Sequence, residues 1–192
     1  MRKSESLYKL EELGLNTLNC FITTDKQEAM HYIAKHGEDL LSMRTERGNE
    51  FHCPFFYKIP GEQLLDLATK HLKEGYKLIF SPSLDTKGCL AFGTVALGEN
   101  ADDIIEVVFG EGKVRDLDNH KDLRTIVVPK GRMIVVSDKE YPGKAYILNS
   151  IFSKLKEVTY DCIPCVIEFS FYDRPVGRLS QNDIYWELRE YI

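Results

Sequence analysis

The segment from Cys89 to Arg115 is the feature that most constrains the fold of this chain. Apolar and polar residues alternate over 91–97 and again over 104–109, and a polar turn at 98–103 separates the two runs. A period of two is typical of strands that bury one face, and a short turn between two such runs favours antiparallel pairing. The sequence therefore predicts an antiparallel meander in the middle of the chain.

Helical spacing of apolar residues occurs on both sides of this meander. Glycines stand where several of these patterns stop, as is typical at the C-terminal end of a helix. The helices that this spacing predicts cover residues 6–13, 25–37, 61–75 and 144–158. The remaining expected strands cover residues 20–22, 40–43, 76–80, 125–128, 133–136, 165–171 and 184–188.

The predicted order is two strand–helix units, an antiparallel block, a helix and a closing pair of strands. This order indicates an α+β fold and disfavours a doubly wound parallel sheet. We expect a single domain over residues 1–192, with two lobes at about 1–80 and 81–192.

Composition excludes several classes of function. A net charge of −5 argues against a general nucleic-acid binder, and no apolar run is long enough for a signal peptide or a membrane span. Five cysteines, an odd number, suit reduced thiols better than a disulfide framework. We therefore expect a cytoplasmic protein with neither a nucleic acid nor a membrane as partner. The sequence contains no Gly-x-Gly-x-x-Gly and no Walker-type loop.

The order of the elements, together with the residues at their joints, resembles the ATP-grasp superfamily along nearly the whole chain. Arg44 at the end of a short strand adds some likeness to the phosphoenolpyruvate synthase-like branch. The segments that carry the resemblance are Gly14–Thr17, Phe21–Ala29, Leu41–Arg44, Leu78–Asp85, Cys165–Phe169 and Tyr185–Arg189. The resemblance implies two small α+β lobes with antiparallel sheets around a central cleft, and it implies ATP and Mg²⁺ as cofactors.

The resemblance also implies how the nucleotide is bound. Lys3 and Arg44 would supply cations for the phosphates, since a site without a Walker loop needs cations from separate elements. The backbone of a hinge strand would bind adenine, and a carboxylate after it would bind a ribose hydroxyl. By the resemblance, these residues are Ser81, Ser83, Leu84 and Asp85.

The resemblance also implies which residues bind the metal and the transferred phosphate. Glu168 and Glu187, on paired strands, would hold Mg²⁺, which prefers carboxylate oxygens together with phosphates. Arg189 stands where many members of the superfamily have asparagine, and it would contact phosphate directly. Arg115 would face the transferred phosphate.

Each of these residues also has a structural interpretation. Lys3 could be solvent-exposed and Arg44 could form an ion pair. Glu168 and Glu187 could point to water, and Glu187 could pair with Arg189 on the same strand face. Cys162-Ile-Pro-Cys165 is a C-x-x-C motif that runs into a strand rather than opening a helix. We therefore prefer core cysteines to a redox or metal site for this pair.

Two departures from the superfamily bear on function. Where many members have a glycine-rich lid, Gly48 stands alone between Glu46 and Glu50, which would repel a triphosphate unless Arg47 compensates. The separate domain that usually helps to form the acceptor site is also lacking, so either a partner protein or a second subunit would supply it, or the domain has lost catalysis. The two hypotheses are an ATP/Mg²⁺-dependent phosphotransferase or ligase with a carboxylate-type acceptor, and a non-catalytic ATP-grasp-like module that binds a nucleotide or a protein.

Overall fold

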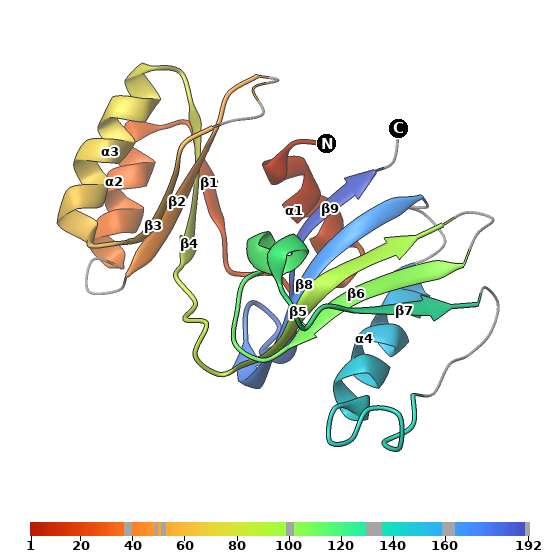
Figure 1. Ribbon diagram of the computed structural model, residues 1–192. Helices are drawn as coiled ribbons and strands as arrows, with labels where there is room; N and C mark the ends of the chain where they lie inside the picture. Colours follow the sequence, from red (N-terminus) through yellow and green to blue (C-terminus); the bar gives the residue numbers. More distant parts are fainter. Residues whose placement is uncertain are drawn as a thin grey trace. The chain divides into compact units, whose positions relative to one another are not determined.

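The computed structural model describes residues 1–36, 40–48, 50, 53–98, 102–129, 136–158 and 164–190 (Figure 1). The chain divides into two compact units, which are considered separately. Unit 2 comprises Arg2–Glu5 and Leu18–Leu84, and unit 1 comprises Met1, Ser6–Thr17 and Asp85–Ile192. The division into lobes at 1–80 and 81–192 stays a prediction.

Unit 2 is a four-stranded antiparallel sheet with two helices, α2 and α3, on one face (Figure 1). The strand order is β1-β4-β2-β3. Its elements are β1 (Phe21–Thr23), α2 (Lys26–Lys35), β2 (Leu41–Glu46), β3 (Phe55–Ile59), α3 (Gly61–Lys73) and β4 (Lys77–Pro82). Its core lies between sheet and helices and includes Leu41, Met43, Leu78 and Phe80.

Local signals account for the ends of these helices. The Asp25 side chain caps α2 by accepting a hydrogen bond from the Glu28 N–H at 2.9 Å. Gly75 follows α3 with a φ of +83°, a left-handed conformation that glycine adopts without strain. The predicted stop at Gly37 lies outside the described residues.

Unit 1 is a five-stranded antiparallel sheet in the order β7-β6-β5-β8-β9. Apolar residues of α4 and of the strands form one core on one face of this sheet. Its elements are β5 (Cys89–Leu97), β6 (Asp103–Phe109), the 3₁₀ helix η1 (Val114–Asn119), β7 (Arg124–Val128), α4 (Ala145–Val158), β8 (Cys165–Val176) and β9 (Gln181–Glu190). Helix α1 (Lys3–Glu12) begins in unit 2 and continues in unit 1.

The meander that the sequence predicted is confirmed, because β5 and β6 pair antiparallel from Ala91–Phe109 to Ala96–Ile104. Other boundaries were wrong. Helix α1 begins at Lys3 rather than at residue 6, and β8 and β9 are longer than predicted. Residues 133–135 of an expected strand lie outside the described residues, and β7 pairs with β6.

The clearest correction concerns β2, which was predicted to end at Met43 and continues to Glu46. Beyond Met43 the buried positions are taken by the polar Thr45 and Glu46, which hid the strand pattern. The sequence analysis also missed β3, which pairs with β2. No helix in the described part of the chain is long and apolar enough to cross a membrane.

Candidate functional site

The sheet of unit 2 presents a polar face on the side turned away from α2 and α3. Leu41 and Met43 belong to the core under the helices, so the alternate residues Ser42, Arg44 and Glu46 of β2 point the other way. The polar residues of this face, called here the polar face of unit 2, are Ser42, Arg44 and Glu46 of β2 and Lys77 and Ser81 of β4; the buried Ile79 lies among them, opposite Arg44. The register places Ser42 opposite Ser81 and Glu46 opposite Lys77.

Glu46 is the most heavily bonded side chain of this face. Its carboxylate accepts hydrogen bonds from the Ser4 N–H at 2.9 Å and the Ser4 hydroxyl at 2.8 Å, and it lies 3.1 Å from the Lys77 ammonium. Burial raises the pKa of Glu46, but these donors outweigh burial and leave the pKa below its ordinary value. Because Ser4 lies in the first turn of α1, Glu46 satisfies an N–H that the helix itself cannot.

Arg44 lies beside Glu46 on the same face and is exposed. Its guanidinium carbon is 4.3 Å from the centre of the Phe55 ring, on the neighbouring strand β3. Within the described parts of the chain, no carboxylate pairs with it, in contrast to Arg47 and Arg189. The stacked ring holds the guanidinium while its N–H donors remain available to an anion.

Lys3, the other predicted phosphate-binding residue of unit 2, begins α1 next to Ser4 and is partly buried. The solvent-exposed interpretation of this lysine therefore does not describe it. The neighbouring Ser4 hydrogen-bonds to Glu46 of the polar face through its N–H and its hydroxyl.

The predicted adenine segment follows β4 and is tied to its neighbours. The Ser83 N–H donates to the Leu40 carbonyl at 3.0 Å, and the Ser83 and Ser42 hydroxyls are 2.6 Å apart. The Leu84 carbonyl accepts from the Tyr57 hydroxyl at 2.5 Å. The Ser83 N–H is thus already used, whereas the Leu84 N–H makes no hydrogen bond among the described residues.

Asp85 begins unit 1, immediately after this segment. One of its carboxylate oxygens accepts a hydrogen bond from the Lys87 N–H at 3.3 Å. This contact closes a short turn, which orients the carboxylate by local backbone geometry.

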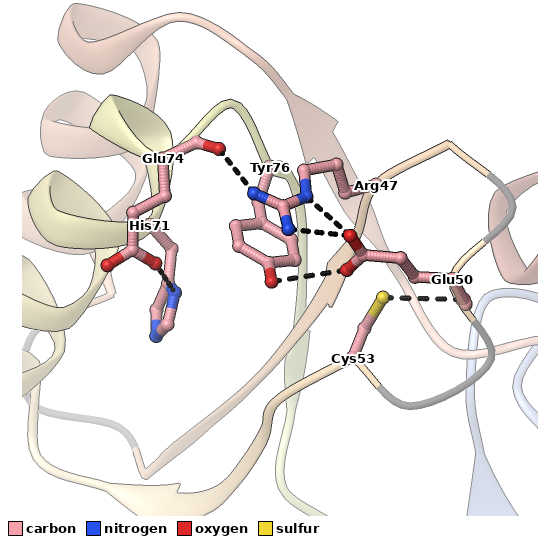
Figure 2. A network of polar contacts seen from close by, with 6 residues as sticks. All are labelled: Arg47, Glu50, Cys53, His71, Glu74 and Tyr76. Carbon is pink, nitrogen blue, oxygen red and sulfur yellow. Dashed lines mark hydrogen bonds and ion pairs between the residues drawn. The ribbon is translucent and has the colours of Figure 1, made fainter.

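A second network of unit 2 lies beside Gly48 (Figure 2). Arg47 donates to Glu50 at 2.8 Å and 2.6 Å and to the Glu74 carbonyl at 3.0 Å, and its guanidinium lies 4.5 Å from the Tyr76 ring centre. The hydrogen bond from Arg47 lowers the pKa of Glu50. Glu46 and Glu50, expected to repel a triphosphate, are therefore both paired with cations of their own unit, and Arg47 compensates for Glu50 as the sequence suggested.

Unit 1 carries an acidic row on the sheet face opposite α4. The register aligns Glu106, Thr94, Glu168 and Glu187 across four neighbouring strands. Arg189, two residues further along β9, donates to Glu187 at 2.9 Å and to Glu168 at 2.5 Å. The fold thus brings together three residues that the sequence singled out. The Glu187–Arg189 pair is the one that its structural interpretation described, and the contact of Arg189 with Glu168 is additional.

The charge of this cluster is set by its surroundings. Burial lowers the pKa of Arg189, but Glu187 and Glu168 raise it more, so the net pKa lies above its ordinary value. The two carboxylates are partly buried, with 24% of the Glu187 side chain and 18% of the Glu168 side chain exposed. The guanidinium therefore stays charged and neutralises one of two closely spaced negative charges.

The Mg²⁺ ion that the resemblance implies does not fit this arrangement. Both predicted ligands are engaged by Arg189, and the described residues contain no group of three or more His, Cys, Asp or Glu side chains that could hold a metal ion. Cys165 is fully buried at the start of β8, as expected of a core cysteine, and Cys162 lies outside the described residues.

Arg115 forms its ion pair with a residue outside the acidic row. It belongs to η1, where its guanidinium is 3.7 Å from the carboxylate of the adjacent Asp116, and 66% of its side chain is exposed. Its predicted contact with a transferred phosphate stays a prediction.

Sequence reasoning missed two parts of the polar face of unit 2. The pairing of Glu46 with Ser4 spans 42 residues and needed the register of β2, while Phe55 under Arg44 needed β3. Three consecutive aromatic residues, Phe55, Phe56 and Tyr57, were the signal for that strand, because aromatic side chains favour strands.

Solved structures of known proteins identify the fold of this chain. No protein-family model and no curated protein matches the sequence. Solved structures do match it. A dinucleotide-forming acetyl-coenzyme A synthetase 1 from Ca. Korarchaeum cryptofilum matches with a TM-score of 0.58 and 12% identity over 100% of this chain and 93% of that chain. The protein PH1788 from Pyrococcus horikoshii Ot3 matches with a TM-score of 0.58 and 14% identity, over 100% and 92%.

The macrocyclase MdnC from Microcystis aeruginosa, bound to its precursor peptide MdnA, matches with a TM-score of 0.54 and 9% identity, over 97% of this chain and 51% of that chain. The chain thus spans about half the length of this macrocyclase. These matches show the fold: an α+β arrangement with two antiparallel sheets, structurally similar to ATP-grasp domains. The ATP-grasp resemblance of the sequence is confirmed at this level.

Proposed function

We propose that this chain is a nucleotide-binding module of the ATP-grasp type, which binds ATP through its phosphates. The observation that carries the proposal is Arg44, an exposed guanidinium that is stacked on Phe55 and has no carboxylate partner among the described residues. The choice of ATP as the ligand rests on the ATP-grasp-like fold, which spans nearly the whole chain.

The chemistry of unit 2 supports this proposal. ATP carries several negative charges, and without a Walker loop these must be met by side-chain cations. Arg44 can donate two parallel hydrogen bonds to phosphate oxygens, and its stacking on Phe55 reduces the conformational freedom that binding would remove. Lys3, in the same unit, would add a second positive charge.

The adenosine part of the ligand would be bound by the segment that follows β4. We assign the adenine to backbone groups of this segment, with the Leu84 N–H as donor and neighbouring carbonyls as acceptors. The ribose would be bound by the Asp85 carboxylate. The residues of this assignment are Ser81, Ser83, Leu84 and Asp85.

The second candidate is an ATP/Mg²⁺-dependent phosphotransferase or ligase acting on a carboxylate-type acceptor. It is favoured by the fold likeness to a synthetase and a macrocyclase. In that version Glu168 and Glu187 hold the metal, Arg115 and Arg189 contact phosphate, and a partner protein or second subunit supplies the acceptor site. Because Arg189 already bridges both carboxylates, the geometry favours nucleotide binding over catalysis.

The test is a calorimetric titration of ATP into the wild type, Arg44→Ala and Arg174→Ala. Arg174 is an exposed arginine of β8 and serves as a matched control for the loss of one positive charge. We expect Arg44→Ala to weaken ATP binding at least about tenfold, the effect of losing about 1.4 kcal/mol. Equal affinities of both variants and the wild type would contradict the role of Arg44.

Release of ADP separates the two candidates. With carboxylic acids supplied as acceptors, the enzyme hypothesis predicts acceptor-dependent ADP formation that requires Mg²⁺. The binding module forms no ADP under conditions in which calorimetry shows bound ATP.

A further inference from the structure

The polar face of unit 2 carries a second cation besides Arg44. Lys77 lies on β4 directly opposite Glu46, and its ammonium is 3.1 Å from the Glu46 carboxylate. The ammonium also donates to the Ser4 hydroxyl oxygen at 3.2 Å, and that hydroxyl donates to Glu46 at 2.8 Å. These three contacts close a triangle, which holds the ammonium in one place although it ends a flexible side chain.

The contacts of Lys77 leave part of its hydrogen-bonding capacity unused. An ammonium group has three N–H donors and no acceptor, and the described residues take two of these donors, one through Glu46 and one through Ser4. The Lys77 side chain is 33% exposed, whereas the Glu46 side chain is 8% exposed. The carboxylate that holds the ammonium is therefore buried, while the ammonium itself reaches the surface with a remaining donor.

The register of unit 2 sets the spacing of Lys77 and Arg44. Arg44 is opposite Ile79, so Lys77 is its diagonal neighbour on β4 and shares its face. Diagonal neighbours on antiparallel strands lie about 7–8 Å apart, a separation that arginine and lysine side chains can span. Phe55 stacks on Arg44 from β3, on the other side of β2, and so does not stand between the two cations.

We infer that Lys77 is a phosphate-binding residue, positioned by Glu46 and Ser4, and that it binds a polyphosphate group together with Arg44. This role rests on the proposed function, because the nucleotide supplies the polyphosphate. Two adjacent phosphates can each receive a charge-assisted hydrogen bond from one of the two cations. Glu46 offsets part of the charge of Lys77, so the contribution of Lys77 comes chiefly from its directed N–H donor.

The experiment titrates ATP and inorganic tripolyphosphate, in buffer with a metal chelator, into the wild type, Lys77→Gln and Lys73→Gln. Lys73 is an exposed lysine of α3, which covers the other face of the sheet, and it controls for the loss of one positive charge (Figure 1). We expect Lys77→Gln to bind both ligands at least about tenfold more weakly than Lys73→Gln does.

A second measurement uses only the wild type and so does not depend on the folding of Lys77→Gln. Lysine side chains are methylated reductively with formaldehyde, with and without saturating tripolyphosphate, and the modified residues are quantified by mass spectrometry. Bound tripolyphosphate should slow the methylation of Lys77 and leave that of Lys73 unchanged.

Two results would overturn the role of Lys77. One is equal affinity of Lys77→Gln and Lys73→Gln for both ligands while Arg44→Ala weakens ATP binding, in which case the proposed function survives without Lys77. The other is unchanged methylation of Lys77 under saturating tripolyphosphate. The proposed function alone fails if tripolyphosphate binds and depends on Lys77 but ATP does not bind. A protein that binds neither ligand contradicts both.

Discussion

Replacing Glu46 with alanine is expected to destabilise unit 2 substantially. The Glu46 side chain is 8% exposed, accepts two hydrogen bonds from Ser4 and lies 3.1 Å from the Lys77 ammonium. Hydrogen bonds to a charged group contribute about 1.5–3 kcal/mol each, and a buried donor left unpaired costs about 1–3 kcal/mol. Because a third of the Lys77 side chain is exposed, solvent screens its share of the interaction.

The expected loss is therefore about 2–4 kcal/mol for Glu46→Ala and about 1 kcal/mol for Glu46→Gln, which retains an acceptor for Ser4. Urea denaturation at pH 7 measures the free energy of unfolding, and hydrogen exchange at the Ser4 amide reports the local contact. A Glu46→Ala variant within about 0.5 kcal/mol of the wild type, with unchanged Ser4 protection, would refute the role assigned to this carboxylate.

The pH dependence of this effect has a defined sign. The pKa of Glu46 is lowered in the folded state, so the unfolded state binds more protons over the range between the two pKa values. The stabilisation by the ionised carboxylate is present above the ordinary pKa of 4.5 and is lost as pH falls through the lower, folded-state value. The difference between the wild type and Glu46→Gln should therefore shrink on acidification, and a constant difference would contradict this reasoning.

Two further substitutions test the packing of unit 1, and the only tryptophan, Trp186 on β9, reports its unfolding by fluorescence. A Cβ at Gly93 would lie 2.1 Å from the Glu106 carbonyl oxygen, so Gly93→Ala should cost about 3 kcal/mol or more, and a thermal midpoint equal to the wild type would contradict this contact. Asn16 is fully buried; its side-chain amide donates to three backbone carbonyls and accepts one N–H. Asn16→Ala should cost about 3 kcal/mol in urea, and a loss below about 1 kcal/mol would show that these bonds contribute little.

The sequence was sufficient for elements whose pattern is carried by apolar residues. Helix α4 and the β5–β6 pair have uninterrupted apolar faces, so their periods are visible without knowledge of the fold. Beyond Met43 the apolar pattern of strand β2 is lost, because the buried residues there are the polar Thr45 and Glu46, which make tertiary hydrogen bonds. His71 is also a polar residue that is buried, and its ring packs against those of Phe56 and Tyr76.

The candidate site shows the same limit. The family resemblance selected Glu168, Glu187 and Arg189 as one group, and the two-residue spacing of Glu187 and Arg189 placed those two on one strand face. It could not decide whether Arg189 leaves the two carboxylates to a metal, because that depends on the register of β8 and β9. Likewise, the sequence identified Arg44 but not Phe55, which holds its guanidinium in place.

The most direct test of the central claim is a calorimetric titration of ATP into the wild-type protein, once in buffer with a metal chelator and once with Mg²⁺. We expect saturable one-site binding in the chelating buffer, with an affinity that falls as salt increases, because the protein's own cations bind the phosphates. An absence of ATP binding in both buffers at about millimolar nucleotide, the weak end of specific affinities, would contradict the proposed function.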